Sequence, residues 1–328
     1  MKYNNTMDWL QALILGIIQG LTEFLPISSS GHLIIGKEIL GLEVTDNIAF
    51  ETVVHCATVL STITILRKEI ATLLLKLFKL EWNPETQYIG MILLSMIPVM
   101  IVGLFFKKNV EQLFGEGLSL VGFMLLITAI LLAMSSLVSG NSKKVEQKKF
   151  FNATDSKNTQ GTQRIKIVIN NLCVLCEKSL RSLRLSIFNL INTLSPNRTN
   201  HKTINWGNAF LIGVAQAVAV LPGLSRSGTT IATGLLLGVK KEEVAKFSFL
   251  MVLIPILGET ALGTMKGDFS TAVSGIPTSS LIIGFFAAYI SGCFACKFMI
   301  ELIKRTNLLW FALYCCIAGI IAIVYSLC

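Results

Sequence analysis

A polar stretch at residues 19–32 carries the side chains best suited to chemistry in an otherwise apolar N-terminal region. Gln19 and Glu23 are four positions apart, so on a helix they would share one face. Pro26 breaks that helix and disfavours helical backbone in the residue before it. Three serines at 28–30 follow, and serine is favoured at the start of a helix. The stretch therefore predicts a helix, a broken tip and a second helix.

Ser29 and His32 would lie on one face of the first turn of the second helix, because they are three positions apart. Backbone N–H groups at the start of this helix would also offer an anion site. Each residue has a structural alternative. His32 could be a buried histidine satisfied by its neighbours, Gln19 could bridge two helices, and Glu23 could reach the membrane surface. At least one of the serines is expected to serve only as a helix cap.

A second polar stretch, at residues 222–230, is suited to phosphate binding. Arg226 presents a planar guanidinium that matches phosphate oxygens. Three hydroxyl residues surround it: Ser225, Ser227 and Thr230. An arginine at membrane depth costs about 2.5–3.5 kcal/mol on insertion scales, so it needs a function or a partner. The structural alternative is an ion pair between Arg226 and Glu23.

The two polar stretches belong to an internal repeat with an offset of 197 residues. Residues 213–216 match residues 16–19, and residues 225–228 match residues 28–31 at this offset. We therefore predict a duplicated fold. Because an odd number of predicted spans separates the two hairpins, the second half would be inverted relative to the first. Inverted repeats with broken helices place ligand sites near the middle of the membrane, where the halves meet.

The composition indicates a polytopic membrane protein. The chain is 53% hydrophobic and 14% charged, and its mean hydropathy is +0.68. A helical span needs about 20 apolar residues, and helices satisfy the backbone in lipid. The expected spans are 48–66, 87–106, 117–139, 244–264, 278–299 and 307–327. We therefore expect an all-α fold with six transmembrane helices and two re-entrant helical hairpins in inverted repeats.

The first 30 residues do not match a cleaved signal peptide, because the polar cluster stands where a cleavage site would be. Cysteine pairs at 173/176 and 293/296 lie far apart in the chain. We interpret them as apolar packing residues rather than as a zinc site.

The excess positive charge lies in one polar insert. Residues 141–205 hold 12 Lys+Arg and 3 Asp+Glu, which equals the net charge of +9 of the whole chain. Because this charge belongs to one membrane-flanking segment, nucleic-acid binding is a poor interpretation. We expect disorder at 141–164 and an amphipathic helix on the lipid surface at 165–194.

The repeat and the insert divide the chain into three segments. They are a first membrane repeat at 1–140 with a re-entrant hairpin at 8–40, the basic insert at 141–205, and a second membrane repeat at 206–328 with a re-entrant hairpin at 207–238. Placing the insert in the cytoplasm leaves both termini outside. Most of the other basic loops then also fall inside, as the positive-inside rule requires.

A carboxylate, an imidazole, hydroxyls and a guanidinium that converge at two helix starts favour phosphoryl transfer. The apolar surroundings suit a substrate with a long apolar tail. Glu23 would either activate a nucleophile or water, or hold a divalent cation against the phosphates. The rival class is a transporter, because inverted repeats and broken helices are also typical of transporters.

The two stretches together resemble the bacterial undecaprenyl-diphosphate phosphatase family, the bacitracin-resistance family of integral membrane phosphatases. The resemblance covers residues 7–139 and 206–327. It implies hydrolysis of undecaprenyl diphosphate to the monophosphate carrier used in peptidoglycan synthesis, in the bacterial inner membrane, at a site open to the periplasm. The expected partners are a polyprenyl diphosphate and membrane lipid, with a homodimer as the expected form of self-association.

The resemblance also implies residue roles. Catalytic roles fall to Glu23, Ser29, His32 and Arg226, substrate phosphate binding falls to Ser225, Arg226, Ser227 and Thr230, and a divalent cation (Mg²⁺ or Ca²⁺) falls to Glu23 and Gln19. Our preferred mechanism is attack by Ser29 on the distal phosphorus, aided by His32. Attack by water activated through His32 or Glu23 is the main variant.

Two features depart from the family pattern. Gln19 replaces a glutamate found in many members, which removes one of two carboxylates for a metal. The insert at 141–205 has no role that we derive from the family. The alternative function for the whole protein is a polyprenyl-phosphate flippase that uses the same inverted-repeat site.

Overall fold

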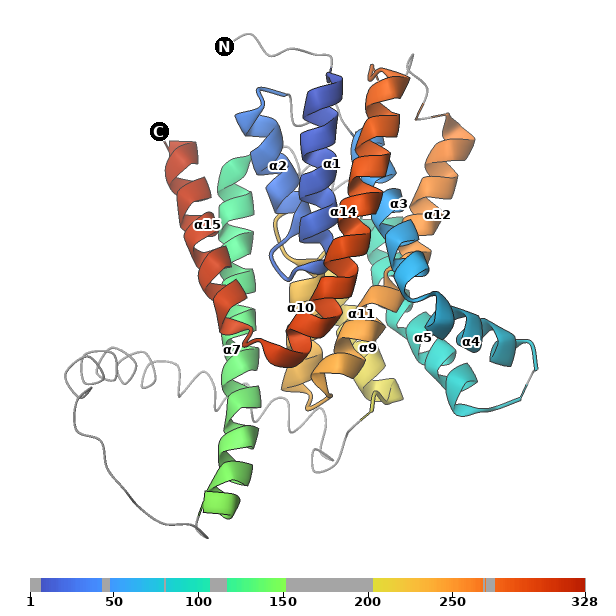
Figure 1. Ribbon diagram of the computed structural model, residues 1–328, viewed down its shortest axis with the longest axis vertical. Helices are drawn as coiled ribbons and strands as arrows, with labels where there is room; N and C mark the ends of the chain where they lie inside the picture. Colours follow the sequence, from blue (N-terminus) through green and yellow to red (C-terminus); the bar gives the residue numbers. More distant parts are fainter. Residues whose placement is uncertain are drawn as a thin grey trace, which may run out of the picture.

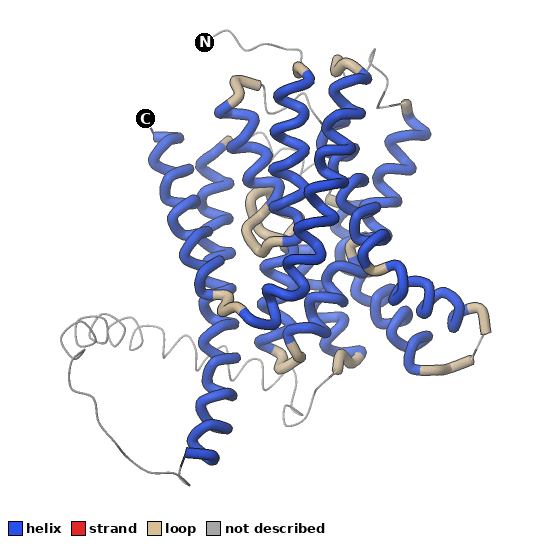
Figure 2. The backbone as a smooth tube through the Cα atoms, in the orientation of Figure 1, coloured by secondary structure: helices blue, strands red, loops and turns tan. Residues whose placement is uncertain are grey.

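The computed structural model describes residues 7–42, 48–79, 81–106, 117–151, 203–267, 269 and 275–327. All regular secondary structure in these residues is helical, and the helices form one bundle (Figures 1 and 2). The predicted all-α fold is confirmed.

The first predicted hairpin consists of two short helices, α1 (Trp9–Phe24) and α2 (Ser29–Ile39). Asp8 begins α1 with a capping box, which satisfies two N–H groups reciprocally. The helix ends just before Pro26, and the side chain of Ser28 caps α2. With 16 and 11 residues, the two helices are shorter than a membrane span and form a broken hairpin, as expected.

The second hairpin repeats the first. It consists of α9 (Trp206–Val218) and α10 (Arg226–Leu236), whose starts follow those of α1 and α2 by 197 residues. Asparagine and serine caps, Asn205 and Ser225, begin the two helices. The internal repeat read from the sequence is therefore present in the helix boundaries.

The described residues contain five helical runs long and apolar enough to cross a membrane, and one bent pair that makes a sixth. The five runs are α5 (Pro84–Phe105), the part Leu118–Leu137 of α7 (Leu118–Phe151), α11 (Lys241–Met251) joined to α12 (Leu253–Lys266), the part Thr278–Ile303 of α14 (Thr278–Arg305), and α15 (Leu309–Leu327). The sixth is α3 (Ile48–Ile65), followed after a 79° bend by α4 (Arg67–Leu77). These helices correspond to the six predicted spans.

Equivalent helix pairs hold the two hairpins in the bundle. α1 packs on α14, and its repeat counterpart α9 packs on α5. A Cβ on Gly16 would lie 2.5 Å from the carbonyl oxygen of Gly284, and a Cβ on the equivalent Gly213 would lie 2.2 Å from that of Ser95. Small residues that let backbones approach closely are typical of membrane helix interfaces. Both hairpins are therefore seated by backbone contact rather than by side-chain packing alone.

The two hairpins enter from opposite ends of the bundle, and their tips meet near its middle (Figure 1). The start of α1 and the end of α15 lie at one end, whereas α9 begins at the other end. α7 continues to Phe151, so residues 141–151 of the insert are helical and the disorder predicted there is wrong. The rest of the insert, including the amphipathic helix predicted at 165–194, lies outside the described residues.

Candidate active site

The carboxylate of Glu23, in the last turn of α1, lies at the centre of the polar residues. Its side chain is only 10% exposed. Its neighbours are Ser29 Oγ at 2.5 Å and Gln19 Nε2 at 2.8 Å, both donating to Oε2, His55 Nε2 at 3.6 Å from Oε2, and Arg226 Nη2 at 3.6 Å from Oε1. The donors on Oε2 and the guanidinium beside Oε1 offset the cost of burying a carboxylate.

The broken tip between α1 and α2 brings Ser29 onto Glu23. Ser28 has φ of 71°, the one positive φ among the described non-glycine residues, and this backbone turns the chain back toward α1. The Ser29 hydroxyl then donates to the Glu23 carboxylate at 2.5 Å. A hydroxyl within hydrogen-bond reach of a base is the arrangement of an activated nucleophile.

The ring of His32 is hydrogen-bonded to groups other than Ser29. Its Nδ1 lies 2.7 Å from the carbonyl oxygen of Ser28, and its Nε2 lies 2.7 Å from the hydroxyl of Tyr314 on α15. The helical spacing that we used places the two residues one turn apart, but the ring turns toward α15. The hydrogen-bond partner of Ser29 is therefore Glu23. The predicted assistance of Ser29 by His32 stays a prediction.

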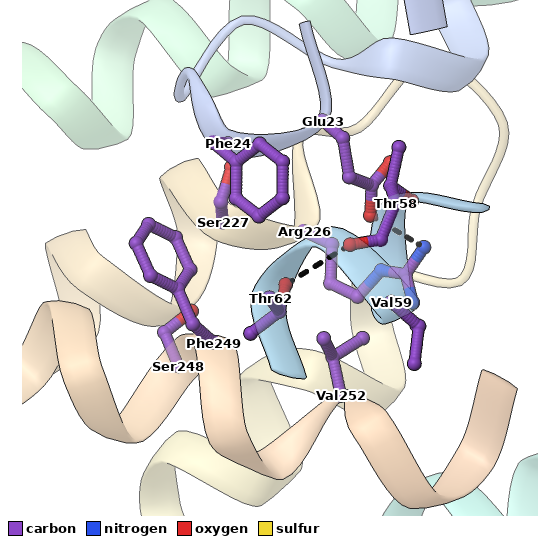
Figure 3. Close-up of a pocket in the computed structure, with 10 residues that line it drawn as sticks. All are labelled: Glu23, Phe24, Thr58, Val59, Thr62, Arg226, Ser227, Ser248, Phe249 and Val252. Carbon is purple, nitrogen blue, oxygen red and sulfur yellow. Dashed lines mark hydrogen bonds and ion pairs between the residues drawn. The ribbon is translucent and has the colours of Figure 1, made fainter. Parts of the chain in front are cut away.

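Arg226 is the first residue of α10 and faces Glu23 across the space between the hairpin tips (Figure 3). The ion pair between Arg226 and Glu23, which was the structural alternative for Arg226, is therefore formed in the structure. The ion pair leaves part of the guanidinium available for other contacts, because the side chain is 30% exposed. A guanidinium has five donors, so it can contact one carboxylate and still bind phosphate oxygens.

The three hydroxyl residues around Arg226 support the start of α10. Ser225 caps the helix, accepting a hydrogen bond from the N–H of Gly228 at 3.0 Å. Ser227 Oγ donates to the carbonyl oxygen of Leu25 at 3.1 Å, which joins the second hairpin to the first. Thr230 Oγ1 lies 2.6 Å from the hydroxyl of Ser248. Phosphate binding by these three hydroxyls stays a prediction.

A small pocket lies beside Glu23 and Arg226 (Figure 3). One part of its wall is polar and the other apolar. The polar residues are Glu23, Thr58, Thr62, Arg226, Ser227 and Ser248, and the apolar residues are Phe24, Val59, Phe249 and Val252. The pocket thus combines an anion-binding surface with an apolar one, as an amphiphilic phosphate ester requires.

Sequence reasoning missed the contribution of α3 to this site. His55 contacts Glu23, and Thr58 and Thr62 line the pocket. These residues follow one another at spacings of three and four, so they lie on one face of a helix that is otherwise apolar. That polar face could have predicted a contribution of α3 to the site, because polar residues in a membrane span usually face the bundle interior. Ser248 on α11 carried no such signal.

The donor set partly fits the divalent cation predicted at Gln19 and Glu23. Gln19 is fully buried, and its Oε1 has no hydrogen-bond partner among the described residues, so an amide oxygen is available beside the carboxylate. No group of three or more His, Cys, Asp or Glu side chains that could hold a metal occurs in the described residues. These two residues therefore fit a hard cation that takes its other ligands from phosphates and water, as Mg²⁺ often does.

Fold and site together define the class of protein: a polytopic α-helical membrane protein whose two inverted hairpins enclose a serine, a carboxylate and an arginine. The family model described as bacitracin resistance protein BacA matches residues 12–321. The chain therefore belongs to the bacitracin resistance protein BacA family.

Curated relatives are similar over almost the whole chain. An undecaprenyl-diphosphatase of Bacteroides fragilis is 47% identical over 321 residues, covering 98% of this chain and 99% of the relative. An undecaprenyl-diphosphatase of Parabacteroides distasonis is 46% identical over 322 residues, with the same coverage. One of Christiangramia forsetii is 40% identical over 322 residues, again covering 98% and 99%.

Proposed function

We propose that this protein is an integral membrane phosphatase that hydrolyses undecaprenyl diphosphate to undecaprenyl phosphate and phosphate. It would thereby recycle the lipid carrier of peptidoglycan synthesis and confer bacitracin resistance. The observation that carries the proposal is the hydrogen bond of 2.5 Å from Ser29 to Glu23, with Arg226 at the other carboxylate oxygen. Nucleophile and base are thus hydrogen-bonded to one another, and the base and the anion-binding cation line one pocket. Family membership and the names of the relatives support the same activity.

The distal phosphate binds at the start of α10, where Arg226 and the first N–H groups of the helix face its oxygens. Ser29 Oγ attacks the distal phosphorus while its proton passes to Glu23. The bond from this phosphorus to the bridging oxygen breaks, and undecaprenyl phosphate leaves with the electron pair. Glu23 releases its proton to the leaving oxygen or to solvent. Water, deprotonated by Glu23, then attacks the phosphoserine, and Ser29 leaves and regains a proton.

Gln19 and Glu23 are the residues that would hold a divalent cation, Mg²⁺ or Ca²⁺. The bound cation would supply positive charge against the diphosphate oxygens. The proposal for this cation rests on the orphaned amide oxygen of Gln19 beside the Glu23 carboxylate.

We also propose that the protein lies in the bacterial inner membrane, with the site open to the periplasmic side. The basic residues at the end of the bundle where α9 begins support this orientation, because the cytoplasmic side is enriched in Lys and Arg. We further propose that the protein forms a homodimer, and light scattering of the purified protein tests this.

The test is phosphate release from a C55 prenyl diphosphate by the purified protein, with and without a chelator. Glu23→Gln should lower turnover by about 10²–10⁴-fold, the usual contribution of a general base. Ser29→Ala should lose turnover but keep lipid binding, because a different group carries the binding. Ser326→Ala, on an exposed serine of α15, is the matched control and should be fully active.

Two results separate the variants of this proposal. A Ser29→Ala protein with near-full turnover, beside an inactive Glu23→Gln protein, would replace serine attack by attack of a Glu23-activated water. A wild-type protein that moves the lipid phosphate across vesicles but releases no phosphate would overturn the phosphatase function and favour a flippase.

A further inference from the structure

Both ring nitrogens of His32 are held by the protein. The carbonyl oxygen of Ser28 lies 2.7 Å from Nδ1 and can only accept, so Nδ1 carries the proton. A neutral imidazole has one N–H, so Nε2 is then an acceptor. The hydroxyl of Tyr314 lies 2.7 Å from Nε2 and donates to it. The two contacts thus select one tautomer and one orientation of the ring.

Tyr314 comes from the last helix, which contacts the tip of the first hairpin at a second point. The thiol of the neighbouring Cys315 donates to the carbonyl oxygen of Pro26 at 3.6 Å. Cys315 also belongs to the same buried apolar cluster as Ile27, on the tip itself. α15 therefore contacts the broken tip through Cys315 and contacts α2 through the hydrogen bond of Tyr314 to His32.

We propose that Tyr314 is a positioning residue for His32, and through it for the turn that presents Ser29 to Glu23. The proposal rests on the proposed phosphatase function only for its effect on turnover. Ser28, whose carbonyl holds the ring, is the residue with φ of 71° immediately before Ser29. A ring locked at Nε2 by Tyr314 keeps Nδ1 on this carbonyl and so holds the strained turn in place.

Tyr314 contacts His32 both through its hydroxyl and through its ring, and a substitution can remove the first contact while keeping the second. The His32 and Tyr314 rings have centroids 5.6 Å apart and planes within 10° of parallel. Tyr314→Phe therefore keeps the ring contact and removes only the hydrogen bond. A matched control is Tyr325→Phe, three turns further along α15, where the tyrosine is 60% exposed.

The direct test is nitrogen NMR of the purified protein labelled with ¹⁵N-histidine. The chain has 3 histidines, so the His32 signals are assigned by their loss in His32→Asn. We expect the wild type to show a neutral ring protonated at Nδ1 with an Nε2 that accepts a hydrogen bond. Tyr314→Phe should keep the proton on Nδ1 and shift the Nε2 resonance, because only the hydrogen bond to Nε2 is lost. Tyr325→Phe should match the wild type. An unchanged Nε2 resonance in Tyr314→Phe would overturn the proposal, and this readout needs no enzyme activity.

A double-mutant cycle tests the effect on turnover. Tyr314→Phe should lower kcat by roughly five- to tenfold, the effect of one hydrogen bond, with KM little changed. In a His32→Asn background the same change should have almost no further effect, because the residue it positions is gone. Equal losses in both backgrounds would show that Tyr314 acts independently of His32. If the protein has no phosphatase activity at all, the proposed function fails while the Nε2 resonance still decides the role of Tyr314.

Discussion

At the residue scale, one carboxylate organises the candidate site. Glu23 receives hydrogen bonds from Ser29 and Gln19 on Oε2 and faces Arg226 on Oε1. Its two oxygens thus serve two chemical tasks, one beside the nucleophile and one beside the phosphate-binding cation. The prediction at this scale separates the shape of the Arg226 side chain from its charge.

Arg226→Lys should lower kcat/KM by about 10²–10³-fold, the range found when one transition-state donor is removed. An ammonium keeps the charge near Glu23 but cannot present two parallel N–H groups to a phosphate. Steady-state phosphate release measures the change. Arg67→Lys, on an exposed arginine of α4, is the matched control and should be unaffected. A lysine variant with nearly full activity would reduce Arg226 to a charge partner of Glu23.

At the element scale, equivalent glycines in the two repeats seat the hairpins against the long helices. Gly16 meets the backbone of α14, and Gly213, its counterpart in the second repeat, meets the backbone of α5. Because the contact is with backbone atoms, an added side chain cannot be accommodated by a rotamer change. The helices themselves must separate, and the hairpin tips move with them.

Gly213→Val should therefore destabilise the protein by about 1–3 kcal/mol or more, the usual cost of overpacking. Its Cβ would lie 2.2 Å from the carbonyl oxygen of Ser95. Gly103→Ala in α5 is the matched control, because no atom lies within 4 Å of its Cβ. The control should be neutral or slightly stabilising, since alanine favours a helix over glycine. Thermal unfolding in detergent measures both, and equal midpoints for the two variants would contradict the packing argument.

At the scale of the whole molecule, basic residues mark one end of the bundle. Arg67 and Lys68 on α4 and Lys79 just after it are exposed, and α11 begins beside Lys240 at the same end (Figure 1). α4 also exposes Leu74 and Leu75, and the exposed Phe78 follows its last residue, so this segment has the apolar and basic surfaces of a helix lying in a membrane interface. The opposite end holds the end of α15.

This charge asymmetry predicts the orientation of the protein in the membrane. In intact cells, on a background without native cysteines, Ser326→Cys should react with a membrane-impermeant thiol reagent. Lys79→Cys should react only after the cells are opened, because the basic end faces the cytoplasm. Both positions are exposed in the structure, so accessibility within the fold does not distinguish them. The reverse pattern would invert the topology and place the site on the wrong side for a periplasmic substrate.

The sequence by itself determined the class of fold, the spans and both hairpins. Those features depend on local physics. Apolar runs define spans, Pro26 ends one helix, and serines at 28 and 225 begin the next in both repeats. The repeat offset located the equivalent helices before any contact between them was known. The motif residues Glu23, Ser29 and Arg226 were also identified at this level, because their types are unusual in an apolar chain.

Only the tertiary structure decided which of these residues meet. Helical spacing brought Ser29 and His32 to one turn, but the positive φ of Ser28 and the hydroxyl of Tyr314 direct the two side chains to different partners. His55 on α3 and Tyr314 on α15 join the site from helices distant in sequence. Such contacts depend on how the helices rotate and pack against one another. The periodic pattern of one helix shows which of its residues share a face, but it does not show which other helix that face meets.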